Sequence, residues 1–234
     1  MLAVSGVTKR YGDDTALADV SVELRPGELT VLVGRSGAGK TTLLRCIDGL
    51  ERPDAGTISL DGEPAAPTDV AMVFQEGALV GTKSALSNVL DGSLGRIPAW
   101  RELLGWHSTA EKRAAIERLH DVGLDGYAER RVSGLSGGEK QRVGIARALQ
   151  QEPAVLLADE PVASLDPATG EQVIERLVEA IRGRGLVGLV SLHQPRLAEQ
   201  VADRYLALAD GDVVLDEPAD RVSPERLAEV YRDS

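Results

Sequence analysis

The sequence has 234 residues and a formal net charge of −11, from 26 Lys and Arg against 37 Asp and Glu. The acidic surplus repels phosphate backbones, which argues against non-specific nucleic-acid binding as the main activity. No stretch approaches the roughly 20 consecutive apolar residues of a membrane span, and the first ten residues lack the basic and apolar segments of a secretory signal. We therefore expect a cytoplasmic protein that reaches a membrane only through a partner.

The first thirty residues predict β-structure. Apolar and polar side chains roughly alternate through residues 2–7 and 15–24, and turn residues stand at 12–14 and 26–27. Tyr11 lies just before the first of these turns. Its ring either packs partly buried in the fold or stacks on the base of a nucleotide bound nearby.

A phosphate-binding P-loop follows the apolar run at residues 30–33 and leads into a predicted helix over 40–48. Its pattern is glycine, four residues and Gly-Lys-Thr, in which the glycines let backbone N–H groups turn toward phosphate oxygens. Lys40 would reach the β- and γ-phosphates, and the Thr41 hydroxyl would ligate Mg²⁺. The alternative is a glycine-rich turn that binds no ligand. The predicted nucleotide contacts are Gly34, Arg35, Ser36, Gly37, Ala38, Gly39, Lys40, Thr41 and Thr42.

The residues after the P-loop predict a helix that ends at Gly49, followed by strands at 57–60 and 70–74. Cys46 is the single cysteine, so an internal disulfide is excluded, and we expect it to be a small buried residue of the helix. The second strand ends at Gln75. An amide there can ligate a metal or position a water, although such a residue is more often an ordinary surface residue.

Residues 76–150 change to helical periodicity and loops, which predicts a helical lobe. Ser108-Thr-Ala-Glu111 is a capping box, and an apolar stripe follows it at helical spacing. Trp100 lies in a stretch that fits either the core or a partner surface. Ser136-Gly137-Gly138 precedes a predicted helix over 140–150, where free N–H groups make either an anion site or a flexible cap.

The later strands end in groups that suit phosphate chemistry. An apolar strand at 154–158 is followed by Asp159 and Glu160, two acids whose repulsion needs a cation or a proton-transfer role to offset it. This Walker B arrangement predicts that Asp159 holds Mg²⁺ and that Glu160 accepts a proton from the attacking water. Asp166 is placed to cap the next helix. A strand at 186–192 ends at His193, which is either structural or a hydrogen-bond partner of the γ-phosphate.

In this order the P-loop, Gln75, Leu-Ser-Gly-Gly, the Asp-Glu strand end, Ser-Leu-Asp and His193 resemble the ATP-binding cassette ATPases over nearly the whole chain. The resemblance implies a single α/β ATPase domain of the P-loop NTPase class over residues 1–234. It would comprise a RecA-like core with an antiparallel β subdomain at 1–75 and 151–234, and an α-helical signature subdomain at 76–150.

The same resemblance implies the residue roles. Tyr11 would stack on adenine, Gln75 would act in catalysis, and Lys40 and His193 would hold the developing phosphate charge during attack by water that Glu160 activates. Mg²⁺ would be held by Thr41, Gln75 and Asp159. Two copies would form a head-to-tail homodimer in which the P-loop of one and the signature of the other sandwich each ATP. The residues implied to act in trans are Ser136, Gly137, Gly138 and Asp166.

A closer resemblance, to the ATPases of bacterial phosphonate importers, lies in residues 88–106, 158–166 and 191–195. It implies a substrate among phosphonates, phosphite or related oxyanions, a transmembrane permease, and a periplasmic or extracellular binding protein. The chain would then lie on the cytoplasmic side of the membrane, with no nucleic-acid partner. The alternatives are a cassette for another solute such as amino acids, one acting on lipids or cell division, and a soluble non-transport cassette.

Two departures from the family pattern stand out. The signature ends in Glu139, where glutamine is commonest, but Ser-Gly-Gly is intact, so we expect activity to survive. Residues 75–80 lack the bulkier side chains expected after the Q-loop glutamine, which bears on how a permease is contacted.

Overall fold

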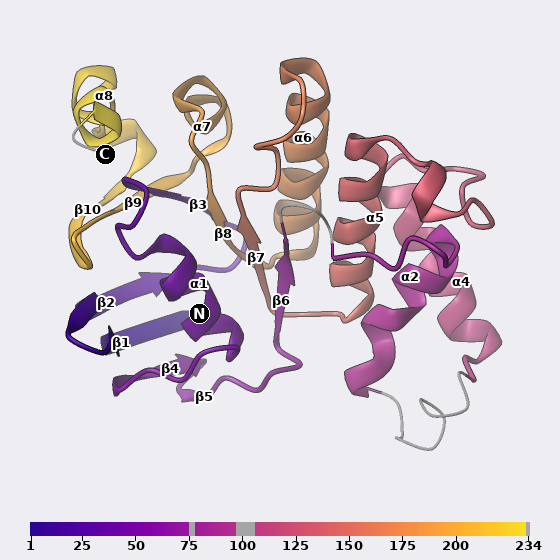
Figure 1. The fold of residues 1–234 in the computed structure, drawn as a ribbon, viewed down its shortest axis with the longest axis horizontal. Coiled ribbons are helices and arrows are strands. Elements are labelled where there is room, and N and C mark those ends of the chain that lie inside the picture. Colours follow the sequence, from indigo (N-terminus) through magenta and orange to yellow (C-terminus); the bar gives the residue numbers. More distant parts are fainter. Residues whose placement is uncertain (75–77, 97–105, 233–234) are drawn as a thin grey trace.

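Two sheets with helices around them make up the fold in the computed structural model, which describes residues 1–74, 78–96 and 106–232 (Figure 1). The antiparallel sheet has the order β2-β1-β4-β5. The larger sheet has the order β10-β9-β3-β8-β7-β6, and β9, β3, β8, β7 and β6 run parallel in it. The strands are β1 (Leu2–Tyr11), β2 (Asp14–Leu24), β3 (Leu29–Val33), β4 (Ala55–Leu60), β5 (Glu63–Pro64), β6 (Val70–Val73), β7 (Val155–Asp159), β8 (Val187–Ser191), β9 (Arg204–Ala209) and β10 (Asp212–Pro218).

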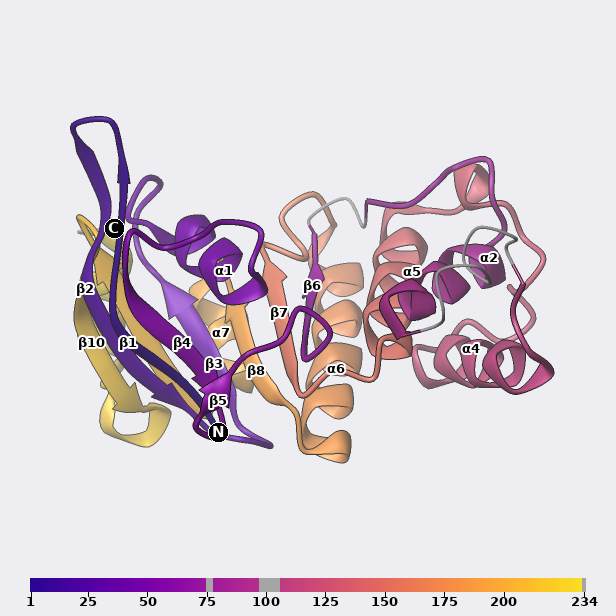
Figure 2. The ribbon, with the colours of Figure 1, turned by 90° about the horizontal axis from the view of Figure 1, so that it is seen from below.

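The helices fall into those that cover the sheets and those of a separate helical part. Figure 2 shows α1 between the antiparallel sheet and the parallel strands, with α2, α4 and α5 beyond α6. The α-helices are α1 (Lys40–Asp48), α2 (Ala85–Leu90), α4 (Thr109–Asp121), α5 (Gly137–Gln150), α6 (Pro167–Arg184), α7 (Pro195–Val201) and α8 (Pro224–Arg232). Short 3₁₀ turns are η1 (Asp91–Arg96), η2 (Val132–Gly134) and η3 (Ala219–Arg221).

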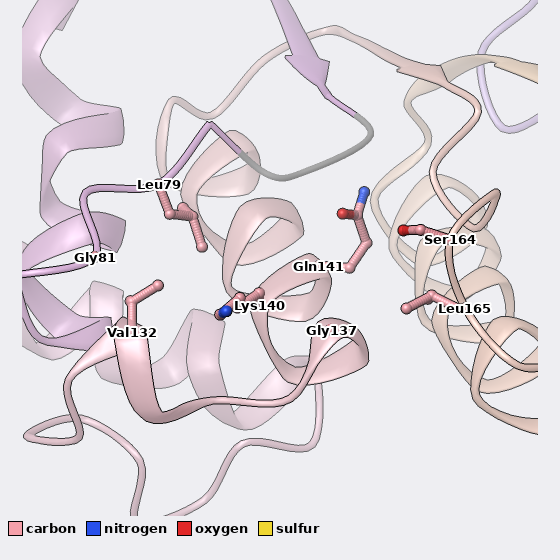
Figure 3. Close-up of a pocket in the computed structure, with 8 residues that line it drawn as sticks. All are labelled: Leu79, Gly81, Val132, Gly137, Lys140, Gln141, Ser164 and Leu165. Atoms are coloured by element: carbon pink, nitrogen blue, oxygen red, sulfur yellow. The ribbon is translucent and has the colours of Figure 1, made fainter.

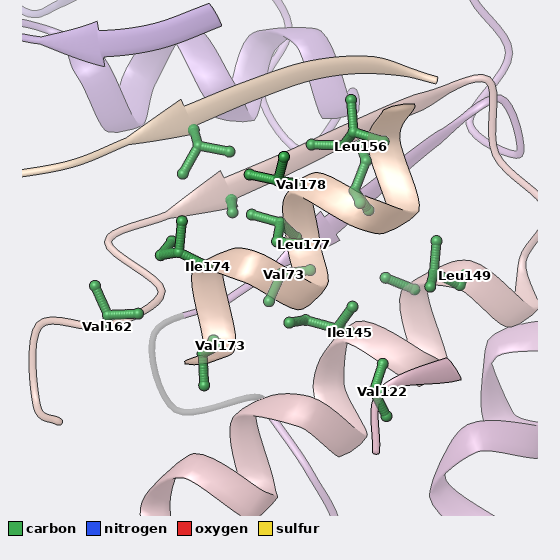
Figure 4. Close-up of a cluster of buried hydrophobic side chains, with 14 of the residues drawn as sticks. Val73, Val122, Ile145, Leu149, Leu156, Val162, Val173, Ile174, Leu177 and Val178 are labelled. Atoms are coloured by element: carbon green, nitrogen blue, oxygen red, sulfur yellow. The ribbon is translucent and has the colours of Figure 1, made fainter. Parts of the chain in front are cut away.

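The parallel strands are buried on both faces, which is why they read as continuous apolar runs in the sequence. Leu32, Leu157 and Leu189 point into a core shared with α1 and the antiparallel sheet. The opposite face packs against α6 and α5 (Figure 4). Side chains of that second core include Val73, Leu156, Ile145, Leu149, Ile174, Leu177 and Val178.

Helix ends follow the predicted capping with one correction. Gly49 ends α1 in the left-handed conformation, and Ser108 and Glu111 form the capping box of α4. The helix predicted over 140–150 begins earlier, at Gly137. Ser136 caps it, and Glu139 closes a second capping box by accepting from the Ser136 N–H at 2.7 Å. Glycine is a poor helix former, so Gly137 and Gly138 do not suggest a helix start. The Ser-x-x-Glu spacing of Ser136 and Glu139 is the sequence pattern that indicates it.

Helix α5 ties the helical part to the sheet on both sides of residues 75–77. The buried side chain of Gln141 donates to the Phe74 carbonyl at 3.0 Å, and Arg147 donates to the Ala78 carbonyl at 2.7 Å. Among the described residues, no helix combines the length and apolar character needed to cross a bilayer.

Asp48, the last residue of α1, should make stability depend on pH. Burial raises the pKa of Asp48 from its ordinary 3.8 to about 6. The pKa of Asp48 is higher in the folded protein than in the unfolded chain, so its protonated form favours folding. This contribution to the free energy of unfolding is complete below pH 4 and is lost as the pH rises through 6. Its charge also opposes the helix dipole. Asp48→Asn should therefore raise the free energy of unfolding by about 1–2 kcal/mol at pH 8 and by much less at pH 4.5.

Urea unfolding of the two proteins at both pH values measures this difference. Asp13→Asn, in the exposed turn between β1 and β2, is the matched control and should change little at either pH. An Asp48→Asn protein less stable than the wild type at pH 8 would contradict the raised pKa of Asp48.

Candidate active site

The P-loop joins the end of β3 to the start of α1, and close backbone contacts require glycine at two of its positions, Gly34 and Gly39. A Cβ on Gly34, at φ 144°, would lie 2.3 Å from the Leu208 carbonyl oxygen. One on Gly39, at φ 100°, would lie 2.4 Å from the Ala16 carbonyl oxygen. Gly39 is also the N-cap of α1, and it has no side chain to occupy the first N–H groups of the helix. Those groups and the helix dipole make the loop an anion-binding site.

Lys40 is held by the loop that it follows. Its side chain is buried, and Nζ donates to the Gly34 carbonyl at 2.5 Å and to the Arg35 carbonyl at 2.8 Å. Burial lowers the pKa of Lys40, and the nearby Glu160 and Asp159 act in the opposite direction. An ammonium has three N–H donors, so these bonds aim the group and leave it able to donate to a phosphate.

Asp159 lies between two hydroxyl groups at the end of β7. Thr41 Oγ1 donates to its Oδ2 at 2.9 Å, and Ser191 Oγ donates to its Oδ1 at 2.8 Å. Ser191 also accepts from the Glu160 N–H at 2.8 Å. The sequence reasoning had missed Ser191, although a polar residue at the end of an apolar strand beside the Asp-Glu strand was a usable signal.

Glu160 and His193 face each other across the ends of β7 and β8. His193 Nε2 lies 2.5 Å from Glu160 Oε1. Glu160 has φ 46°, a left-handed conformation that is uncommon outside glycine and is concentrated at functional sites. The two side chains remain partly exposed, at 45% for His193 and 30% for Glu160, so a water molecule can reach the carboxylate.

Tyr11, at the end of β1, keeps 48% of its surface exposed. Its hydroxyl donates to Glu51, which also accepts from Arg45 of α1 at 3.2 Å. Lys9 Nζ lies 5.4 Å from the ring centroid. The ring is thus held at its hydroxyl end and accessible along much of its surface, and Arg45 connects its anchor to the helix that begins at the P-loop.

The signature residues form a second group around the start of α5. Gly138 is packed against α6, since a Cβ there would lie 2.2 Å from Thr169 Cγ2. Thr169 N–H in turn donates to Asp166, the N-cap of α6, at 3.1 Å, and hydrogen bonds from Thr169 lower the pKa of Asp166. A cavity of about 380 Å³ opens beside Gly137 and is lined by residues of α5, of the segment before α6, of the segment before α2 and of η2 (Figure 3).

Glu139 keeps its charge at this second group. The backbone N–H of Ser136 and the Tyr127 hydroxyl, the latter at 2.7 Å, both donate to its carboxylate and lower the pKa of Glu139. Ser136 Oγ meanwhile accepts from the Glu139 N–H at 3.3 Å. The carboxylate thus fills the capping-box role that a glutamine side-chain oxygen can also fill.

A family model described as ABC transporter matches residues 17–163. The chain belongs to this family. The cassette is 72% identical over 233 residues to the phosphonates import ATP-binding protein PhnC 1 of Natronomonas pharaonis, with 100% of each chain covered. It is 44% identical to the phosphonates import ATP-binding protein PhnC of Halobacterium salinarum, over 98% of this chain and 83% of that one.

Solved structures of cassettes share the fold. A nucleotide-free ATP-binding cassette superposes with a TM-score of 0.85 at 22% identity, covering 100% of this chain and 95% of that one. A dimeric post-hydrolysis cassette bound to ADP and Pi gives a TM-score of 0.79 at 30% identity, with 94% and 99% covered. The predicted α/β P-loop NTPase fold and the family resemblance are therefore confirmed.

The structure of the cassette places the predicted site residues in two groups. Lys40, Thr41, Asp159, Glu160 and His193 gather at the carboxyl ends of β3, β7 and β8. The signature and Asp166 form the other group, and within the described part of the chain no hydrogen bond or ion pair links it to the first. Gln75 and Trp100 lie outside the described residues.

Proposed function

We propose that this cassette hydrolyses ATP with Mg²⁺ as the energy-coupling subunit of an importer for phosphonates or related phosphorus oxyanions. The observation that carries the substrate class is the 72% identity, over the full length of both chains, to a phosphonates import ATP-binding protein. ATP hydrolysis is supported by two hydrogen-bonded pairs beside the P-loop, Thr41 with Asp159 and His193 with Glu160.

The P-loop, residues 34–42, would bind the phosphates of ATP through its N–H groups and Lys40, and the exposed ring of Tyr11 would stack on adenine. Mg²⁺ would be held by Thr41, Asp159 and Gln75. Within the described residues no group of three or more His, Cys, Asp or Glu side chains could hold a metal. The Thr41 hydroxyl and the Asp159 carboxylate, whose oxygens lie 2.9 Å apart, supply the oxygen ligands that Mg²⁺ prefers, and waters and phosphate oxygens would complete its coordination.

In hydrolysis Glu160 would accept a proton from a water whose oxygen attacks the γ-phosphorus, while the bond to the β,γ-bridging oxygen breaks and ADP leaves. Lys40 and His193 would donate hydrogen bonds to the developing charge, and Gln75 would help to orient the water. Bound Mg²⁺ would neutralise charge on the β- and γ-phosphate oxygens.

The second group of residues would act on the ATP of a partner copy. Ser136, Gly137, Gly138 and Asp166 lie together at the ends of α5 and α6, without a described link to the P-loop of their own chain. Solved dimeric cassettes that are 30% and 31% identical to this chain support a homodimer. In it, residues 76–150 would form the signature subdomain and residues 1–75 and 151–234 the core.

A permease would dock beside the end of α1, at a cavity that residues of η1 and α5 also line. A cavity of about 330 Å³ there is lined by Leu50, Met72, Phe74 and Arg147, among others, and Leu50 is 59% exposed. Such docking would hold the cassette on the cytoplasmic face of the membrane, with substrate selection left to a periplasmic or extracellular binding protein. No nucleic-acid partner is proposed, since the net charge is −11.

Growth of a deletion strain tests the substrate class. With phosphonate as the sole phosphorus source the strain should fail to grow, while inorganic phosphate should support normal growth. Normal growth on phosphonate, with failure on an amino acid as nitrogen source, would favour the amino-acid importer instead. Affinity purification of the tagged cassette should recover a membrane permease, and recovery of ribosomes would favour the soluble non-transport class.

A further inference from the structure

Ser191 ends β8 at the centre of the parallel sheet, and its side chain is wholly buried. In the strand ladders it lies in register with Asp159 on β7 and with Leu32 on β3, two residues before the P-loop begins. Its backbone therefore lies between the ends of the two strands that carry the proposed chemistry. A buried hydroxyl needs hydrogen-bond partners, because an unsatisfied one is costly in the interior.

One oxygen of Ser191 contacts both acids of the Asp159-Glu160 pair. The Glu160 backbone N–H can only donate, so at 2.8 Å the Ser191 oxygen accepts there. Its own proton then goes to the Asp159 carboxylate, also at 2.8 Å. The donor and acceptor roles are therefore both fixed by chemistry. Thr41 holds the other carboxylate oxygen, so the plane of the Asp159 carboxylate is set from both sides.

We infer that Ser191 is a positioning residue for the hydrolytic reaction, an inference that rests on the proposed function. Ser191 orients the Asp159 carboxylate, which would hold Mg²⁺ together with Thr41. It also holds the backbone of Glu160 in its left-handed conformation, from which the side chain reaches His193. The Ser191 oxygen is engaged by the Glu160 N–H and the Asp159 carboxylate. It acts through the two acids, and small displacements of such groups lower the rate more than they lower binding.

The test is steady-state hydrolysis of Mg-ATP by the full chain carrying Ser191→Ala. The change removes one oxygen from a packed strand, so the protein should fold. We expect kcat to fall about 10- to 100-fold while KM for ATP changes by less than about threefold. Ser191→Thr keeps the hydroxyl and should restore most of kcat, provided that its melting temperature matches that of the wild type.

Thr30→Val is the matched control. Thr30 is a buried hydroxyl residue on the neighbouring strand β3, and its Oγ1 has no hydrogen-bond partner among the described residues. Its replacement should leave kcat within about twofold of the wild type.

Three results would overturn the inference: a Ser191→Ala kcat within about twofold of the wild type, an equal loss in Thr30→Val, or a loss confined to KM. These results are distinct from failure of the proposed function. If the wild type hydrolyses no ATP, or if Glu160→Gln is fully active, the proposed chemistry itself is wrong.

Discussion

Glu160→Gln should lower kcat for Mg-ATP hydrolysis by about 10²- to 10⁴-fold, the range attributed to a positioned general base. Glutamine has nearly the same shape and still presents an oxygen toward His193, which lies 2.5 Å from the carboxylate. It cannot accept the proton of the attacking water. The Ser191 bond to the Glu160 backbone N–H does not involve the side chain, so the local backbone should persist.

Because only the proton acceptor is lost, the variant should still bind ATP with wild-type affinity and should accumulate ATP-bound dimers. Equilibrium nucleotide binding and size-exclusion chromatography with Mg-ATP measure these two properties. Glu171→Gln removes an equivalent charge from the exposed face of α6 and should hydrolyse ATP normally. A Glu160→Gln enzyme with normal kcat would show that another group takes the proton.

Sequence patterns predicted the fold well where one local rule decided the structure. The strands β3, β7 and β8 are buried on both faces and read as apolar runs, and β7 and β8 end in the polar residues Asp159 and Ser191. The capping residues Ser108, Asp166 and Gly49 act through neighbours within three or four residues. The start of α5 was placed three residues late, because a glycine pair is a poor helix former and only the capping box outweighs it.

The active-site groups that sequence reasoning missed depend on partners far along the chain. The two missed residues are Ser191, which lies 32 positions from its partner Asp159, and Glu51, which lies 40 positions from its partner Tyr11. No sequence spacing predicts either contact, because each pair of residues comes together only when the strands take their places in the sheets. The P-loop could be recognised in the sequence because its glycines, Lys40 and Thr41 all lie within residues 34–41. Local motifs thus predicted the chemistry, and the tertiary fold adds the residues that we propose position it.

Mixing two inactive variants should restore hydrolysis if each ATP site is shared between copies. Lys40→Ala removes the ammonium from the P-loop, and Ser136→Glu places a second carboxylate beside the signature, where a γ-phosphate would approach. Each homodimer then carries two damaged sites, and we expect both variants to lose most of their activity. A mixed dimer has one doubly damaged site and one intact site, because the wild-type P-loop of one copy meets the wild-type signature of the other.

With random mixing half of the dimers are mixed, so activity should recover to about a quarter of the wild-type value if sites turn over independently. Ser108→Glu is the matched control, since Ser108 caps α4 with the same capping box and lies outside both groups. It should lower stability much as Ser136→Glu does but leave hydrolysis intact. A mixture no more active than its components would show that the signature does not complete the site of a partner copy. Recovery above both components is the result that only a site shared between two copies produces, because neither chain alone holds an intact P-loop and an intact signature.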